Sequence, residues 1–463
     1  MREKMWRMSK QCKEESRDLE KAKFGRRLFL RVAIGGTVVI PFWLGLKAIL
    51  LRRRYDKISY QRESNDNVPV YLFRGASPEV NIQRFVRRLG GIDSIVGKDD
   101  IVIIKPNAQW WRQGMTNTDS IVALIEMILD SPNFSGEVII ADNHQAQVDN
   151  AAGWTTDEPN GRLNLNGVVD WFNQKGYKNV TKYHWHCAGA NPNPLQGNAS
   201  GNAVVSGPGK SDGYVWERDN FYVAANKHKC LMTYPIFTSA YSGVTIDFKH
   251  GAWRDGAYTG QPIRFINMSS LNYHGTYAGA TASVKNLMGV VDMSCGFPAP
   301  EPRNTYNTHH IGIKSQFLGR VHRQMLRSVR IHREAYKAVD VLLAAEEYMD
   351  FHFTGGVLGR WISTVRKPDL NIITADWVGN GGRLDLDNAS RPRALVASTD
   401  AVAADYVAAK YVLLPETRKH LPGSINCKLV DPDNRDGPFH KFLLYAASET
   451  DGAMDDAHID LLG

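Results

Sequence analysis

The chain has 463 residues, enough to bury a large hydrophobic core, and its 43% hydrophobic and 22% charged residues are typical of a globular protein. Its formal charge of +8 is an N-terminal property, because residues 1–57 carry 16 Lys/Arg and 6 Asp/Glu whereas residues 58–463 carry 40 and 42. This near-neutral body argues against nucleic acid as a partner. The five cysteines form no C-x-x-C pair, which argues against an iron–sulfur cluster and a zinc knuckle.

The N-terminal part predicts a membrane anchor. Residues 1–31 form a basic tail, and residues 32–51 are apolar with Lys47 as their single charge. A helix of this length spans about 30 Å, enough for the hydrocarbon core of a bilayer. Eleven Lys/Arg precede the span and four follow it, which favours a cytoplasmic N-terminus and a body on the outer, periplasmic side. Residues 52–69 are expected to be a linker.

The basic tail ends in Arg26-Arg27-Leu-Phe-Leu-Arg31, which resembles the twin-arginine export signal with Gly25 in place of the usual Ser or Thr. The resemblance implies export by the twin-arginine translocase. No A-x-A cleavage site follows the apolar run, so we expect an uncleaved anchor. A plain signal anchor and a buried helix of a soluble protein are the alternatives.

From residue 70 onwards, apolar β-branched runs alternate with helical patterns. The predicted strands are 70–73, 101–104, 138–141, 180–183, 230–233, 370–374 and 394–398, and the predicted helices are 118–129, 165–174, 338–348 and 401–412. This alternation predicts an α/β domain over residues 70–463, with a mainly parallel sheet flanked by helices. Two α/β lobes around a central cleft would satisfy the same pattern. Residues 188–226 are rich in Gly, Asn, Ser and Pro and predict a loop-rich insertion.

Polar residues follow the apolar part of several predicted strands. They are Lys105, Asn107, Asp142, His144, Asp376 and Asp400. In open α/β sheets, ligands bind beyond the carboxyl ends of the strands, so we expect these side chains to build one polar site. A single Asp in such a place can instead cap the next helix, and Asp400 directly precedes one.

The acidic residues and the histidine in this set favour a metal site. Carboxylates combined with an imidazole suit Mg²⁺, Mn²⁺ or Zn²⁺. We therefore predict that Asp142, together with His144 or Asp376, contributes to a divalent-metal site. For His144, the alternative is a polar loop residue without a ligand.

A second polar block contains Lys285 and Asn286 and lies between Gly279 and Gly289. Burying an unpaired ammonium costs several kcal/mol, so a lysine between small residues is expected to face a cleft and to meet an acid of the protein or of a ligand. If it is buried, the lysine acquires a lowered pKa and could act as a base.

The two lysines and their neighbouring amides together predict an anion site. Lys105 and Lys285 supply charge, and Asn107 and Asn286 supply directional donors, a combination that suits a carboxylate or a phosphate. We expect these four residues to line one cleft that binds a small anionic ligand. The adjacent Trp110-Trp111 pair either walls this cleft or packs in the core.

In this order, the blocks resemble the DUF362 family, a widespread group of unassigned function. The blocks are Ile103-Ile-Lys105-Pro-Asn107, Met115-Thr-Asn117, Ile140-Ala-Asp142-Asn143, Ser283-Val-Lys285-Asn286-Leu-Met-Gly289, Lys367-Pro-Asp369, Gly379-Asn380-Gly-Gly382 and Thr399-Asp400-Ala-Val-Ala-Ala-Asp405. The resemblance covers about residues 95–415. It implies an α/β domain and leaves the reaction open.

The chain departs from the family pattern in three places. The family's Pro-x-x-Lys-x-His is absent after Pro235, and Lys249 and His250 in the following insertion are the expected substitutes. The family's Asp-Pro-Val-Ala reads Asp400-Ala-Val-Ala here. The ferredoxin-like cysteine module of many relatives is also missing, so a redox role is not carried over.

These observations lead to one set of expected site residues. The expected catalytic residues are Lys105, Lys285 and Asp376, and the expected ligand-binding residues are Asn107, Thr116, Asn117, Lys249, His250, Asn286, Asn380 and Asp400. The chain is expected to be an exported, membrane-anchored enzyme that acts on a small anionic substrate. A non-catalytic ligand-binding or cofactor-maturation factor is the alternative.

Overall fold

A computed structural model describes residues 58, 60–132, 134–143, 153–185, 203–293, 304–305, 308, 311–312 and 350–463. The described residues belong to one unit of the chain, 56–312 together with 350–463. The expected twin-arginine motif, the apolar span 32–51 and the predicted helix 338–348 lie outside them. Within the described ranges, no helix is long and apolar enough to cross a membrane.

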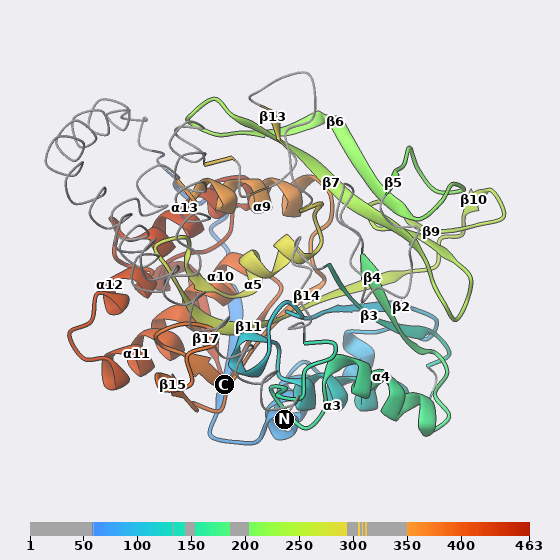
Figure 1. Cartoon of the computed structure of the whole chain (residues 1–463), viewed down its shortest axis with the longest axis horizontal. Helices are drawn as coiled ribbons and strands as arrows, with labels where there is room; N and C mark the ends of the chain where they lie inside the picture. Colours follow the sequence, from blue (N-terminus) through green and yellow to red (C-terminus); the bar gives the residue numbers. More distant parts are fainter. Residues whose placement is uncertain are drawn as a thin grey trace, which may run out of the picture. The chain divides into compact units, whose positions relative to one another are not determined.

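The largest element is a sheet whose strands follow the order β17-β1-β16-β14-β11-β2-β3-β4 (Figure 1). Their bounds are β1 Val68–Arg74, β2 Ile101–Lys105, β3 Glu137–Asn143, β4 Val180–Trp185, β11 Ile263–Gly275, β14 Leu370–Gly379, β16 Ala394–Ser398 and β17 Ile459–Leu462. β14, β11, β2, β3 and β4 run parallel, and β16 runs antiparallel to β14 and β1. The short strands β12 (Gly279–Thr281) and β15 (Ala389–Ser390) pair with β11 and β14. The predicted mainly parallel sheet is confirmed.

Three helices cover one face of this sheet and close the main hydrophobic core. They are α2 (Pro78–Arg88), α3 (Thr118–Leu129) and α4 (Leu165–Gln174). Their apolar sides pack on alternate residues of the strands, such as Val102, Ile104 and Val138. Each such buried side chain contributes about 1.5–3 kcal/mol. Because strand side chains alternate, the residues between them, including Lys105, point to the other face.

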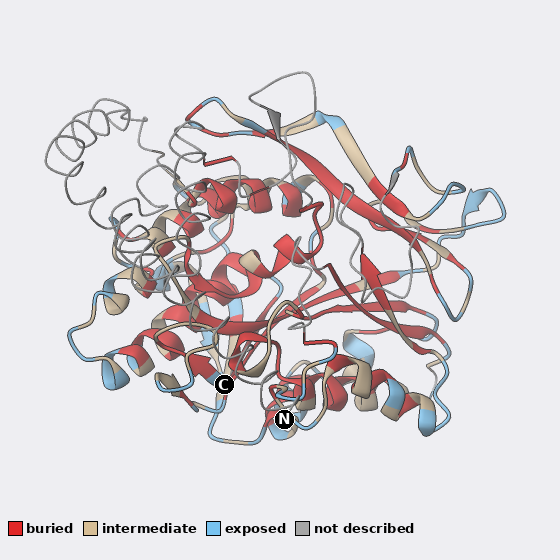
Figure 2. Cartoon of the chain, in the orientation of Figure 1, coloured by how far each residue is buried: buried red, intermediate tan, exposed pale blue. Residues whose placement is uncertain are grey.

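The other face carries the helices that hold the site. They are α5 (Ser283–Asn286), α9 (Phe353–Thr364), α10 (Ala401–Val407) and α13 (Pro438–Thr450). α5 contacts β11, α9 and α10, so it lies between the sheet and the outer helices (Figure 1). Figure 2 shows this short helix and the strands beneath it as mostly buried. Residues 408–413 continue the helix after α10 as a π-helical turn, and α11 (Leu414–His420) and α12 (Asn426–Val430) complete this side.

A second sheet corrects two expectations. Its strands are β5 (Ala203–Val204), β6 (Gly213–Val223), β7 (Lys229–Thr238), β8 (Thr245–Asp247), β9 (Gly251–Arg254), β10 (Ala257–Tyr258) and β13 (Asn304–Thr305). Residues 213–223 were expected in a loop but form a strand, because the aromatic residues around Trp216 and Tyr222 favour a pleated surface despite the flanking glycines. The predicted strand 230–233 belongs to β7 of this mostly antiparallel sheet. The extra strands therefore form a β-sheet and not a second α/β lobe.

The strand β11 was not predicted, although it lies between β2 and β14 in the main sheet. Asn267, Ser269, Ser270 and Asn272 interrupt its apolar pattern, yet all four are fully buried. Buried polar side chains require hydrogen-bond partners, and those of β11 are supplied by distant segments. The polar residues that obscure the strand pattern of β11 in the sequence are therefore residues in and around the site described below.

Candidate functional site

A row of polar side chains crosses four neighbouring strands beneath α5. Lys105 on β2 lies in register with Asn267 on β11, Asn267 with Asn371 on β14, and Asn371 with Ser398 on β16. None of the four is more than 1% exposed. Residues that are in register on adjacent strands share one face of a sheet, so this row forms a polar floor in an otherwise apolar layer.

The amides of this floor bind α5. Asn267 Nδ2 donates to the Ser283 carbonyl (3.0 Å) and to Asn371 Oδ1 (3.0 Å), and Ser283 Oγ donates to the same Asn371 oxygen (2.8 Å). Asn286 Nδ2 donates to Asn267 Oδ1 (2.9 Å) and to the Lys105 carbonyl (3.2 Å). Asn286 was expected to bind ligand, and the structure also gives it the role of joining α5 to the sheet.

Asp405 on α10 caps the N-terminal end of α5. Its two carboxylate oxygens accept hydrogen bonds from Ser283 N (2.5 Å) and Val284 N (3.0 Å). Asp405 is fully buried, and burial raises its pKa to about 8 although both backbone hydrogen bonds favour the charged form. The cap fixes the turn that carries Lys285.

Lys105 forms a buried ion pair with Asp142. Its Nζ lies 2.9 Å from Asp142 Oδ1 and also donates to the Pro106 carbonyl (2.8 Å) and to Asn286 Oδ1 (3.0 Å). Burial lowers the pKa of Lys105 and raises that of Asp142, and their mutual attraction opposes both shifts. Asp142 also accepts from the backbone N–H groups of Ala108 and Asn143. All three Lys105 protons are therefore used within the protein.

Gly289 closes the block because the ion pair occupies the space beside it. A Cβ atom at this position would lie 2.0 Å from Asp142 Oδ1 and 2.2 Å from Lys105 Nζ. Both contacts are far inside van der Waals distance, so any larger residue would displace a buried charge. The glycine is therefore required for close packing and not for its backbone conformation.

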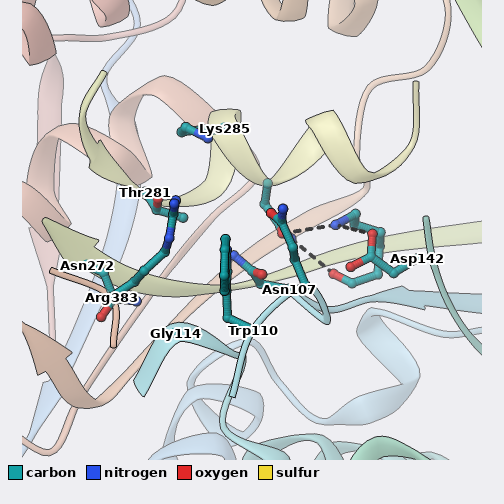
Figure 3. A pocket seen from close by; sticks show the side chains of 11 residues that line it. Asn107, Trp110, Gly114, Asp142, Asn272, Thr281, Lys285 and Arg383 are labelled. Atoms are coloured by element: carbon teal, nitrogen blue, oxygen red, sulfur yellow. Dashed lines mark hydrogen bonds and ion pairs between the residues drawn. The ribbon is translucent and has the colours of Figure 1, made fainter. Parts of the chain in front are cut away.

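One pocket lies above this floor (Figure 3). Its cavity volume is ≈ 10 Å³, room for about one water molecule, and it is lined by Lys105, Asn107, Gln109, Trp110, Gly114, Asp142, Asn272, Thr281, Lys285, Asn286 and Arg383. Lys105 and Asp142 neutralise each other. Lys285 and Arg383 therefore give the lining a net positive charge, and the Asn107 amide adds directional donors, whereas the amides of Asn272 and Asn286 donate within the protein. This composition suits an anion.

Lys285 has no carboxylate within ion-pair distance among the residues that the structure describes, and its Nζ contacts Met288 Sδ at 3.5 Å, a weak acceptor. Its side chain is mostly buried. Burial, together with the positive charges of Arg383 and Lys105, lowers the pKa of Lys285 to about 7. A large fraction of Lys285 amines is therefore neutral at neutral pH.

Arg383 is the second cation of the pocket. Its guanidinium carbon lies 4.2 Å from the centre of the Trp110 ring, and its Nη1 lies 2.5 Å from His274 Nε2. Burial lowers its pKa to about 10. Figure 3 shows its side chain extending towards Thr281, with Trp110 beside it. Trp110 therefore lines the pocket, which is the first of its two expected roles; the other was packing in the core.

The structure brings Lys105, Asn107, Lys285 and Asn286 around this one pocket, together with Asp142. Two neighbouring expected residues support it without lining it. Thr116 Oγ1 accepts from the Asn107 backbone N–H (2.7 Å) and donates to the Met268 carbonyl (2.7 Å). Asn117 caps α3 by accepting from Ser120 N (2.9 Å).

Five expected residues have partners outside the pocket lining. Asp376 binds Arg391 Nε (3.1 Å), Asn380 donates to Ser390 Oγ (3.0 Å), and Asp400 caps α10 through Val402 N (2.8 Å). In the second sheet, Lys249 pairs with Glu217 and His250 contacts Asp247. β14 ends at the same edge as β2 and β3, but alternation points Asp376 to the opposite face. β16 runs antiparallel to β14, so Asp400, which follows β16, lies at the other edge of the sheet.

His144 lies outside the described residues. Within the described ranges, no three His, Cys, Asp or Glu side chains are grouped so that they could hold a metal ion. Asp142 uses its oxygens for Lys105 and two backbone N–H groups, so a metal there would have to displace the lysine. The divalent-metal site stays a prediction.

Four further residues line the pocket that were not expected from the sequence: Arg383, Gln109, Asn272 and Thr281. Arg383 had a detectable signal, because it directly follows the glycine loop 379–382 near the end of a predicted strand. Asn272 had none, since β11 was not recognised. Its side chain donates to the Gln113 carbonyl (2.7 Å) and accepts from Gly379 N (2.8 Å), which joins the two loops that frame the pocket.

Comparison with protein families gives one match, in which residues 203–410 correspond to the family described as "Domain of unknown function (DUF362)". The matched segment includes Lys285, Asn286, Arg383 and Asp405, whereas Lys105 and Asp142 precede it. The expected extent, about 95–415, was therefore longer than the matched one. No curated protein and no solved structure matches the chain.

Proposed function

We propose that this DUF362-type domain binds a small anionic molecule, a carboxylate or a phosphate, in the Lys285–Arg383 pocket, and that it is an enzyme in which Lys285 takes part in the reaction. One observation carries the proposal: two partly buried cations face one pocket, and neither has a carboxylate within ion-pair distance among the described residues. Buried charges in proteins are normally paired, so an anionic ligand is the expected partner.

The state of Lys285 favours an enzyme over a pure binding protein. A lysine that only attracts an anion works best when it is fully charged. A pKa near 7 makes the amine available both as a proton acceptor and as a proton donor at neutral pH. A non-catalytic ligand-binding factor remains the alternative, and it would bind the same anions without turnover.

The proposal predicts that anion affinity depends on pH. An anion between the two cations stabilises protonated Lys285, so the pKa of Lys285 is higher in the complex than in the free protein. Below pH 7 the free lysine is already charged and affinity is highest. As the pH rises above about 7, each bound anion must bring a proton with it, and affinity falls by up to about tenfold per pH unit.

Isothermal calorimetry on the full-length protein with acetate, oxalate and phosphate between pH 5.5 and 9 tests this. Lys285→Met and Arg383→Met should each weaken binding by about tenfold or more. Lys285→Met should also abolish the pH dependence near 7 of acetate and oxalate binding, since these two anions do not titrate there. Lys98→Met, at an exposed lysine, is the matched control. Unchanged affinity and pH profile in Lys285→Met would contradict the proposal.

We also propose that the protein is exported and anchored by residues 32–51, with this domain on the outer side of the membrane. The support is the arginine pair before an apolar run of sufficient length and the charge bias across it. The site itself does not depend on this placement.

A further inference from the structure

We propose, on the basis of the anion-binding function above, that Lys285 forms an imine with its ligand, so that the substrate is a small aldehyde or ketone that also carries a carboxylate or a phosphate. Lys285 is then a catalytic residue that bonds to the carbonyl carbon. Arg383 binds the anionic group and places the carbonyl next to the amine.

The first argument is the contrast between the two lysines of the pocket. Lys105 donates to Asp142, to Asn286 and to a backbone carbonyl, so its amine is held by three acceptors. The Lys285 amine contacts a thioether sulfur at 3.5 Å and is not held by any carboxylate in the described part of the chain. Its nitrogen lone pair is available for bond formation, whereas that of Lys105 is not.

The second argument is the charge around Lys285. Lysines that form imines in proteins are activated by desolvation or by a neighbouring cation, which favours the neutral amine. Both conditions hold here, since the side chain is mostly buried and faces the charges of Arg383 and Lys105. Asp142, the carboxylate of the pocket, is bound to Lys105 and is not free to act as a base.

The third argument is that the amine sits on a fixed support. α5 has only four residues, but Asp405 caps its start and the amides of Asn267 and Asn286 bind it to the sheet. Precise placement of a nucleophile within the pocket requires such support. Arg383 is held in turn by the Trp110 ring and by His274.

The step balances without any oxidant or reductant. The neutral Lys285 amine adds to the carbonyl carbon, and the carbonyl electron pair moves to oxygen, which takes up the proton that nitrogen loses. The resulting hydroxyl leaves as water while the second nitrogen proton is lost, and the C=N bond forms. Thr281, which also lines the pocket, carries a hydroxyl that can exchange these protons. The products are one imine and one water.

Reductive trapping in the full-length protein tests this inference. Sodium cyanoborohydride would be added with pyruvate or glycolaldehyde phosphate as carbonyl anions, with acetaldehyde as the carbonyl without an anionic group, and with acetate as the anion without a carbonyl. Peptide mass spectrometry would locate the reduced adduct. We expect Lys285 to be labelled about tenfold or more faster than exposed Lys98 by a carbonyl anion, and we expect this ratio to be smaller for acetaldehyde and in Arg383→Met, where the contribution of anion binding is missing. Preference for pyruvate would assign a carboxylate, and preference for glycolaldehyde phosphate would assign a phosphate.

Two results separate the inference from the function on which it rests. Lys285→Arg keeps the charge without a nucleophilic amine, so it should still bind acetate but form no adduct at that position. If Lys285 in the wild-type protein is labelled no faster than Lys98 while acetate or phosphate still binds, imine formation is wrong and anion binding stands. If neither anion binds and no adduct forms, both are wrong.

Discussion

Two lysines of one pocket differ in role because their immediate partners differ. Lys105 is 1% exposed and completely paired, with Asp142 as its counterion. Lys285 is close by, yet it has no such partner among the described residues, and burial with two neighbouring cations lowers its pKa to about 7. Lys105 therefore has a structural role, and Lys285 is the lysine that is available to a ligand.

Replacing the two lysines by methionine should have opposite effects on stability. Lys105→Met leaves Asp142 as an uncompensated buried charge, which should lower the free energy of unfolding by about 3–5 kcal/mol. Lys285→Met removes a desolvated charge and should leave stability unchanged or raised. Urea denaturation at pH 7 measures both. Equal destabilisation by the two substitutions would show that the roles are not separated in this way.

Gly289→Ala should destabilise the protein because its Cβ would clash with both members of the ion pair, at 2.0 and 2.2 Å. We expect a loss of about 3 kcal/mol or more, since either the glycine turn or the buried pair must move. Gly382→Ala is the matched control, as its Cβ would meet only Asp385 Cβ at 3.7 Å. Thermal denaturation of both variants checks this, and similar melting temperatures would argue against the close packing.

At the scale of elements, α5 shows how a very short helix can be fixed in place. Four residues are too few to form a stable helix alone, because nucleation costs more than one turn of hydrogen bonds returns. Its stability comes from outside, through the Asp405 carboxylate on α10 and the amides of the polar floor. Residues from β2, β11, β14 and α10 therefore meet at one turn.

Asp405→Asn should change how stability depends on pH. The folded-state pKa of about 8 exceeds the ordinary value of 3.8, so the folded protein retains a proton that the unfolded chain releases. This contribution is fully present below about pH 4 and is lost as pH rises towards 8, with a slope of up to about 1.4 kcal/mol per pH unit. The stability of the wild-type protein relative to Asp405→Asn should therefore fall from pH 4 to 8.

Asp451→Asn is the control with the opposite sign. Asp451 also accepts two backbone hydrogen bonds, from Glu63 N and Ser64 N, but it is more exposed. Its burial is slight, so the hydrogen bonds that stabilise the charged form together outweigh desolvation, and the pKa of Asp451 is lowered. The stability of wild type relative to this variant should rise with pH until the pH exceeds the ordinary value of 3.8. Denaturant unfolding of the wild type, Asp405→Asn and Asp451→Asn at a series of pH values measures both differences in stability. If the two differences change with pH in the same direction, the raised pKa of Asp405 is wrong.

At the scale of the whole molecule, the pocket lies at the carboxyl ends of β2, β3 and β11, where an open parallel sheet is expected to bind ligands. The parallel strands and their helices build the pocket, and the second sheet contributes none of its lining residues. The expected site residues in that sheet, Lys249 and His250, are instead paired with Glu217 and Asp247.

Export should depend on the arginine pair of the N-terminal tail. Replacing Arg26 and Arg27 by lysine in the full-length chain should block translocation of a reporter fused to the C-terminus, because the twin-arginine route requires the arginines. Membrane fractionation should find the wild-type chain in the membrane pellet. Export that persists in the double variant would exclude the twin-arginine route, and a chain recovered entirely in the soluble fraction would exclude the anchor.

Local patterns in the amino-acid sequence are sufficient to predict several helices and strands. The apolar runs 101–104, 138–141, 370–374 and 394–398 became strands, and 165–174 became a helix, because burial of periodic apolar side chains dominates their stability. It also predicted that Lys105, Asn107, Lys285 and Asn286 line one cleft, and all four line the same pocket.

Which of these groups are available to a ligand depends on contacts between segments that are distant in the chain. Lys105 and Asn286 hydrogen-bond across 181 positions of the chain, and no local pattern encodes that contact. β11 was hidden because its polar residues are satisfied by partners from other strands, and Arg383 enters the pocket because a glycine loop turns it towards Trp110. Pairing a buried charge requires a specific neighbour in space, and that neighbour is set by the packing of distant segments.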